Sequence, residues 1–271
     1  MSTFLGNNNS PIGVYDSGMG GLIVLETLIE QFPNEDFIFI ADNANFPYGT
    51  KTSEQIEEIN LNIYNYLKSQ NCKAVCIACN TASANSYLLD KKAEIPIIKT
   101  IEPTVKLIKE NINKDKNNIL VIATNLTIKT KIYEQELDKY LLNFPHHYYA
   151  LATQNFVNIV EEGRYGTINS FEEIKETLKD YLDKDIDKII LGCTHFSKLK
   201  PEIKILFPNA YIYSSEKAMA KELKNELIND LNKETNKQNI ILITTGDLDL
   251  FINQTKWFKY KEKAIYKSIK I

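Results

Sequence analysis

The sequence predicts a mainly parallel, doubly wound α/β fold arranged as two domains. Apolar runs of strand length alternate with longer amphipathic stretches, the pattern that parallel sheets with crossover helices produce. The strand-like runs are continuously apolar, as burial on both faces of a sheet requires. Two segments look like crossings between halves, "KTIEPTV" around Pro103 and "LFPNAY" around Pro208. We therefore expect one domain at 104–207 and a discontinuous one made of 1–103 plus 208–271.

The predicted elements follow one another regularly. Strands are expected over 11–18, 36–42, 73–79, 95–101, 117–124, 146–153 and 187–193. Helices are expected over 20–32, 52–70, after Pro103, over 127–142 and over 170–183. The first helix shows the three-to-four spacing of apolar residues that marks one buried face. Ser53 is a candidate cap for the second helix.

Composition argues against several classes of protein. The 271 residues carry a formal net charge of −3, which favours neither nucleic acid nor an anionic membrane as a partner. No apolar run approaches the roughly 20 residues of a membrane span. The stretch "MSTFLGNNNS" lacks the basic and apolar regions of a signal peptide. Four cysteines in a chain of this length indicate free thiols in a reducing cytoplasm rather than a disulfide framework.

Three of the four cysteines lie within "CKAVCIACNTAS" (72–83). An iron–sulfur cluster on C-x3-C-x2-C needs a flexible loop, but the residues in between predict a strand in which Cys72 and Cys76 face one side and Cys79 the other. A redox pair of Cys76 and Cys79 should open a helix, whereas Cys76 lies inside the strand. Zinc is disfavoured because the chain has only three histidines. We expect Cys72 and Cys76 to be buried bystanders, and no metal site.

The segments "AVCIACNTAS" and "KIILGCTHFS" share a design, with one copy in each half of the chain. Each is an apolar strand with a cysteine at its carboxyl end, Cys79 or Cys193, followed by threonine and then serine. Ligands of open α/β sheets bind at the carboxyl ends of strands. Both thiols could be core residues, but the polar neighbours Asn80-Thr81 and Thr194-His195 are costly to bury unless something uses them. The pattern favours a functional pair.

"DSGMGG" follows the first predicted strand and opens a helix. Asp16 or Ser17 could simply cap that helix. Alternatively, a carboxylate and an amide-rich helix start could face a ligand. The stretch lacks the G-x-G-x-x-G order of a dinucleotide-binding loop, and it contains no lysine. "FPYGT" (46–50) follows the second strand as a turn that could reach over the same crevice.

Five motifs in this order, "GVYDSGMGGL", "PYGT", "ACNTAS", "VEEG" (160–163) and "LGCTHF", resemble those of the glutamate racemases, members of the cofactor-independent aspartate/glutamate racemase family. The resemblance runs from about residue 11 to about residue 250. It implies two similar α/β domains related by a pseudo-twofold, with the active site in the cleft between them. It also implies racemisation of glutamate without pyridoxal phosphate or any other cofactor, a homodimer, and D-glutamate supplied to peptidoglycan synthesis.

The resemblance assigns roles to individual residues. Cys79 and Cys193 would be the acid/base thiols, assisted by Asp16 and His195 respectively, with Glu161 as the acidic residue near the second thiol. The substrate pocket would be lined by Asp16, Ser17, Pro47, Tyr48, Gly49, Asn80, Thr81, Thr194 and His195.

The chain also departs from the family pattern. Ser197 stands where proline usually follows an aromatic residue, Ala123-Thr124 replaces a Gly-Thr pair, and "YIYSSEKAM" replaces a turn that contains aspartate.

Several alternatives stay open. Aspartate and hydantoin racemases are the near rivals, whereas the presence of both cysteines argues against a decarboxylase built on one thiol. A protein of another class could keep the pocket for binding without turnover. A third possibility is a hydrolase that uses Cys193 and His195, which we disfavour because residues two apart after a strand rarely point at each other.

Overall fold

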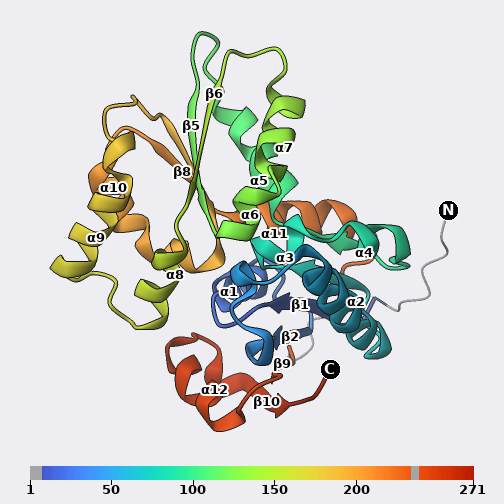
Figure 1. Ribbon diagram of the computed structural model, residues 1–271. Coiled ribbons are helices and arrows are strands. Elements are labelled where there is room, and N and C mark those ends of the chain that lie inside the picture. Colours follow the sequence, from blue (N-terminus) through green and yellow to red (C-terminus); the bar gives the residue numbers. More distant parts are fainter. Residues whose placement is uncertain (1–7, 233–237) are drawn as a thin grey trace.

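The computed structural model describes residues 8–232 and 238–271 and contains two separate parallel sheets, each in its own lobe (Figure 1). Residues 1–7 of the stretch expected to lack a signal peptide lie outside the described part. Within the described ranges, no helix is both long and apolar enough to span a bilayer.

The two sheets repeat one strand order. The first sheet runs β10-β9-β2-β1-β3-β4 and the second β6-β5-β7-β8, with every neighbouring pair parallel. Their bounds are β1 Ile12–Asp16, β2 Phe37–Ala41, β3 Ala74–Ile77, β4 Ile97–Ile98, β5 Asn118–Ala123, β6 His147–Ala152, β7 Lys188–Gly192, β8 Tyr211–Tyr213, β9 Ile240–Thr244 and β10 Ala264–Ser268. Four strands of each sheet occur in the order second, first, third, fourth, which confirms two similar α/β units. Strands β1 and β3 therefore correspond to β5 and β7.

Helices cover both faces of each sheet, so the central strands β1, β2, β3, β5 and β7 are fully buried. The helices are α1 Gly21–Gln31, α2 Ser53–Ser69, α3 Asn80–Ala84, α4 Tyr87–Lys92, α5 Ile101–Ile108, α6 Asn125–Lys129, α7 Ile132–Leu141, α8 Gln154–Glu161, α9 Ile168–Leu178, α10 Lys200–Leu206, α11 Ser215–Glu226 and α12 Leu248–Gln254. Two short 3-10 helices, η2 (Tyr48–Thr50) and η5 (Thr194–Leu199), follow β2 and β7.

The chain crosses between the lobes twice. The division into 1–103 plus 208–271 and 104–207 stays a prediction, to which the pairing of strands adds detail. Strand β8 lies beyond position 207 and pairs with β7, so the second sheet includes it. Helix α5 packs in the core of the second sheet and α11 in that of the first, and these two helices contact each other.

Some helix boundaries differ from the sequence prediction. Thr52, not Ser53, caps α2, because its hydroxyl accepts from the backbone N–H of Gln55 while the Gln55 side chain accepts from the N–H of Thr52, a capping box. The helix expected after Pro103 begins two residues before it. Proline is tolerated there because the first turn of a helix leaves its N–H groups without intrahelical partners.

The region after β5 also differs. The single helix predicted over 127–142 is two helices, α6 and α7, because Lys131 has a left-handed backbone with φ 56°. Helix α8 was not predicted, although it follows β6 directly. Its apolar residues Phe156, Val157 and Ile159 pack into the core of the second sheet.

A buried ion pair connects the residue before β3 to segments distant in the sequence. The ammonium of Lys73 is fully buried and lies 2.6 Å from a carboxylate oxygen of Glu35. It also donates to the carbonyl oxygens of Asn8 (2.7 Å) and Asp230 (2.8 Å). The buried ammonium therefore has three polar partners, and loss of any one of them should destabilise the fold.

We expect Glu35→Gln to lower the free energy of unfolding by about 3 kcal/mol, because a buried ammonium loses its counter-charge. Urea denaturation at neutral pH measures this. The matched control is Glu30→Gln, which removes the exposed ion pair with Lys259 (2.5 Å) and should change stability little. Equal effects of the two substitutions would contradict the role of the buried pair.

Candidate active site

A small cavity of about 20 Å³, room for about one water molecule, lies between the two lobes at the carboxyl ends of their strands. Residues that follow β1, β2 and β3 line it from one sheet, and residues that follow β5, β6 and β7 line it from the other. The lining residues are Ser17, Phe46, Pro47, Tyr48, Gly49, Cys79, Asn80, Thr81, Thr124, Gln154, Val157, Cys193, Thr194 and His195. Of the predicted site residues, all but Asp16 and Glu161 belong to this lining.

Cys79 and Cys193 occupy corresponding positions in the two units, after β3 and after β7. Both thiols are free and buried, and both line the cavity. Cys79 precedes α3 and donates to the hydroxyl of Ser17 at an Sγ–Oγ distance of 3.8 Å. Burial raises the pKa of Cys79, and the nearby charge of Asp16 raises it further. This environment favours the protonated thiol at position 79.

His195 connects Cys193 to Glu161. Its Nδ1 lies 3.6 Å from Sγ of Cys193, and its Nε2 lies 2.5 Å from Oε1 of Glu161. The expectation that residues two apart after a strand do not meet is therefore wrong here, because η5 begins directly after Cys193 and turns the imidazole back toward the thiol. Burial alone would lower the pKa of His195, but the contacts with Cys193 and Glu161 outweigh it and hold that pKa well above its ordinary value.

Asp16 contacts the start of α1, as one of the two readings of the sequence expected. Its Oδ2 accepts from the backbone N–H of Gly21 at 2.8 Å, at the start of α1, and from the hydroxyl of Thr194 at 3.4 Å. Its Oδ1 is buried and has no hydrogen-bond partner among the described residues. Burial raises the pKa of Asp16, an effect that the positive charge of His195 opposes. One oxygen is thus committed to the helix start and the other is uncommitted.

The glycines of "GMGG" serve close packing between the lobes. A Cβ atom on Gly20 would lie 2.4 Å from Oγ1 of Thr194 and 2.8 Å from Nδ1 of His195. The start of α1 can approach the second sheet's site only because this position has no side chain. Contact between lobes, rather than a phosphate loop, explains the sequence at this position.

Two polar side chains after Cys79 reach across the cleft. The hydroxyl of Tyr133, from α7, donates to Oδ1 of Asn80 at 2.7 Å, whereas Nδ2 of Asn80 is buried without a partner in the described part of the chain. The hydroxyls of Thr81 and Thr124 lie 2.9 Å apart. Because Thr124 follows β5, this hydrogen bond joins the two lobes at the cavity.

The turn after β2 forms another wall. Tyr48 donates its hydroxyl to Oδ2 of Asp42 at 2.6 Å, so that polar group is already bonded within the turn. Gly49 lies directly against the second lobe: a Cβ there would be 2.4 Å from Oε1 of Gln154 and 3.0 Å from Cβ of Thr124.

Cys72 and Cys76 are buried and do not line the cavity, but they are not arranged as expected. Cys76 packs in the core with α1, while Cys72 packs on the other side of the sheet, in the same cluster as Cys79. The alternation of a strand does not extend to Cys72 because β3 begins only at Ala74. Burial raises the pKa of Cys72 to about 12. No three or more cysteine, histidine, aspartate or glutamate side chains converge as metal ligands among the residues described.

Sequence reasoning missed three polar residues at the site, besides the apolar lining residues Phe46 and Val157. Thr124 directly follows β5, and Gln154 follows Thr153, the first residue after β6. The rule that ligands bind at strand ends could therefore have found both. Tyr133 comes from the middle of the chain segment assigned to one helix, and no local signal pointed to its contact with Asn80.

Two parallel α/β units whose matching strand ends bring two thiols into one cavity define a two-domain α/β enzyme with a paired-cysteine site. The chain belongs to the Asp/Glu/hydantoin racemase family, whose model matches residues 18–223. It is 36% identical over 91% of its length to glutamate racemase 1 of Caldanaerobacter subterraneus subsp. tengcongensis, 91% of which is covered.

Solved structures agree with this assignment. A glutamate racemase isoform of Bacillus anthracis superposes with a TM-score of 0.87 at 31% identity, over 98% of each chain. The glutamate racemase of Francisella tularensis in complex with D-glutamate gives a TM-score of 0.85 at 30% identity, over 97% of this chain and 98% of that one.

The buried carboxylate of Asp16 should cost stability. Its pKa is raised in the fold, so the folded state disfavours the charged form above that pKa. We expect Asp16→Asn to raise the melting temperature at pH 8 and to lose this advantage as the pH falls below about 3.8, the ordinary pKa of the carboxyl, where it is protonated in both states. Differential scanning calorimetry across this range measures the effect. A lower melting temperature at pH 8 would contradict it.

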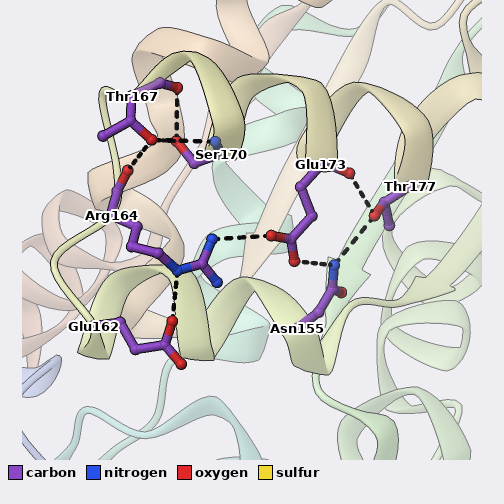
Figure 2. A network of polar contacts seen from close by, with 7 residues as sticks. All are labelled: Asn155, Glu162, Arg164, Thr167, Ser170, Glu173 and Thr177. Carbon is purple, nitrogen blue, oxygen red and sulfur yellow. Dashed lines mark hydrogen bonds and ion pairs between the residues drawn. The ribbon is translucent and has the colours of Figure 1, made fainter.

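The His195–Glu161 pair should stabilise the fold in the opposite sense. Because the pKa of His195 is raised, its contribution is complete below about 6.5, the ordinary value for histidine, and is lost as the pH rises through the folded value. Glu161→Gln should therefore destabilise more at pH 6.5 than at pH 10 in urea denaturation. The neighbouring Glu162, whose carboxylate binds the exposed Arg164 at 2.5 Å (Figure 2), supplies the control. Glu162→Gln should show no such dependence.

Proposed function

We propose that this protein is a glutamate racemase that interconverts L-glutamate and D-glutamate without a cofactor, with Cys79 and Cys193 as its two bases. The observation that carries the proposal is the pair of buried thiols at matching strand ends of two similar units, lining one cavity. Membership of the racemase family and the likeness to glutamate racemases over nearly the whole chain support the choice of reaction.

Racemisation requires a base on each face of the reacting carbon. One thiolate removes the α-hydrogen as a proton, leaving the electron pair on carbon, and the opposite thiol donates its proton to the other face. The first cysteine then carries the proton and the second is the thiolate, so the opposite enantiomer is processed in the reverse direction. Two cysteines on facing sheets meet this need without moving a base around the substrate.

The surroundings of the two sulfurs support unequal resting states. His195 as imidazolium stabilises negative charge on Cys193, and Glu161 stabilises the imidazolium. Burial and Asp16 keep Cys79 as the thiol. In this proposal Cys193 removes the proton in one direction, and Cys79 supplies the proton to the opposite face.

The uncommitted polar atoms of the site support an amino-acid substrate. Oδ1 of Asp16 is an acceptor suited to an ammonium, and Nδ2 of Asn80 is a donor suited to a carboxylate; both lack partners among the residues described. A polar group buried without a hydrogen bond is costly, so a bound α-amino acid would satisfy both. Donors aimed at the α-carboxylate would also stabilise the charge that develops when the α-proton leaves.

The contact between Cys193 and His195 also suits a thiol hydrolase, which is the second candidate. A hydrolase of this kind would leave Cys79, which matches Cys193 in the first unit, without a role. The family model also favours racemisation. The homodimer, the cytoplasmic location and the supply of D-glutamate to peptidoglycan synthesis are further parts of the proposal, which rest on the family resemblance.

The first test follows L-glutamate in D2O by proton NMR and polarimetry with purified protein and no added cofactor. Joint loss of the α-proton signal and of optical rotation is the expected result, with slower or no loss for L-aspartate. If neither enantiomer of glutamate or aspartate exchanges its α-proton, racemisation is wrong and a binding protein that retains the pocket becomes the better hypothesis.

Cysteine variants separate the working thiols from the bystanders. Cys79→Ser and Cys193→Ser should each reduce turnover at least 100-fold, on the order of what loss of a general acid or base costs. Cys72→Ser and Cys76→Ser, corrected for any loss of folded protein by circular dichroism, should stay within about threefold of the unmodified enzyme. Similar losses at all four positions would sink the assignment.

A further inference from the structure

The amide of Gln154 lies at the cavity and is a third uncommitted polar group, after that of Asp16, which lies outside the lining, and that of Asn80, which is part of it. Gln154 is the first residue of α8. It follows Thr153, which is the N-cap of α8 and the first residue after β6. Gln154 lines the cavity that both thiols also line. Its Oε1 is buried and has no hydrogen-bond partner within the described residues. The family resemblance did not include this position among the substrate-binding residues.

The amide lies in a narrow place between the lobes. The turn after β2 approaches it so closely that a Cβ on Gly49 would lie 2.4 Å from Oε1 of Gln154. The same Cβ would lie 3.0 Å from Thr124, whose hydroxyl pairs with that of Thr81 across the cleft. The backbone of Gly49 and the side chain of Thr124 therefore confine the amide.

A carboxamide can present either end to the cavity. Rotation by 180° about its last bond exchanges the oxygen for the NH2 group in nearly the same volume. In one orientation the buried end is an acceptor, and in the other it is a neutral donor. In the second orientation, the NH2 group can donate to an anionic oxygen that a ligand brings into the cavity.

The other two uncommitted atoms belong to the end of the cavity near Cys79. Asn80 is the next residue in the chain, and Asp16 acts on the Cys79 thiol electrostatically. Gln154 instead lies against Gly49, beside Thr124. A substrate whose ammonium and α-carboxylate occupy the first end would extend its side chain toward Gln154.

We propose that Gln154 is a specificity-determining residue whose amide donates a hydrogen bond to the side-chain carboxylate of glutamate. The inference rests on the proposed function and adds a residue and a role to it. A site built to hydrogen-bond a group discriminates strongly against analogues that do not present it. A four-carbon dicarboxylic amino acid falls one methylene short and leaves the amide unpaired, so Gln154 favours glutamate over aspartate.

The principal test is Gln154→Leu, which keeps the approximate volume and removes both polar atoms. We expect KM for glutamate to rise about tenfold or more, as loss of a hydrogen bond to a charged group implies, with kcat within about threefold. Any rate of α-proton exchange with aspartate should change less than twofold. The preference for glutamate over aspartate then falls by about tenfold.

The matched control is the next residue in the chain. Asn155 donates to Glu173 at 3.3 Å and to Thr177 at 3.2 Å, within a network on the side of α8 that faces α9 (Figure 2). Asn155→Leu should leave KM and kcat for glutamate within about twofold, while both variants are checked for folding by thermal melting.

A second variant gives a readout that a merely space-filling role would not produce. Gln154→Glu places a carboxylate against the substrate carboxylate, so KM should rise more than in Gln154→Leu at pH 8. The increase should shrink as the pH falls toward 5, because protonation of the introduced carboxyl restores a donor. Normalising each KM to the unmodified enzyme at the same pH removes the titration of other groups.

Three results would overturn the inference while the proposed function stands: a KM change below twofold in Gln154→Leu, equal losses for glutamate and aspartate, or a fall in kcat with KM unchanged. If the unmodified enzyme fails to exchange glutamate at all, the proposed function falls first and this inference with it. The unmodified enzyme, assayed in the same series, distinguishes the two cases.

Discussion

The close apposition of two sheet ends is the constraint on which the site depends. Two sulfurs can act on opposite faces of one carbon only if the lobes that carry them are held at a fixed separation. The absence of a side chain at Gly20 lets the start of α1 reach Thr194 and His195, and the hydrogen bond between Thr81 and Thr124 joins the lobes beside the thiols. The glycines and threonines of the motifs thus determine the spacing of the cysteines.

This apposition also determines the electrostatics. Closing the lobes buries Asp16, His195 and Cys79, and burial disfavours the charged form of each. The fold offsets this by sharing groups between lobes: Thr194 of the second lobe donates to Asp16 of the first, and Glu161 supports His195. Among the described residues at the site, the atoms that remain unpaired are Oδ1 of Asp16, Nδ2 of Asn80 and Oε1 of Gln154. A ligand of complementary charge that forms hydrogen bonds with these atoms would remove the free-energy cost of leaving them unpaired.

Much of the fold was accessible from the sequence because it depends on local patterns. Continuous apolar strands, their alternation with helices, and cysteines at two matching strand ends predicted β1 to β7 and the pair Cys79 and Cys193, but not β8, β9 or β10. Features decided by tertiary contact were not accessible. The helix break at Lys131, whose backbone is left-handed, has no glycine that would have predicted it. The contact between His195 and Cys193 depends on the 3-10 helix η5. The place of Gln154 after β6 could be predicted from the sequence, but its contact with Gly49, a residue about a hundred positions away, could not.

The size of the cavity sets a further requirement on how the enzyme operates. Room for about one water molecule is too small for glutamate, which has ten non-hydrogen atoms, so the proposed function requires the lobes to separate before the substrate enters. Such a separation would break the Thr81–Thr124 hydrogen bond and expose the uncommitted atoms of Asp16, Asn80 and Gln154 to water. Re-closure around a substrate exchanges those water contacts for bonds to its ammonium and carboxylates. A ligand that fills only part of this set leaves a buried polar atom unpaired when the lobes meet, so closure itself contributes to substrate selection.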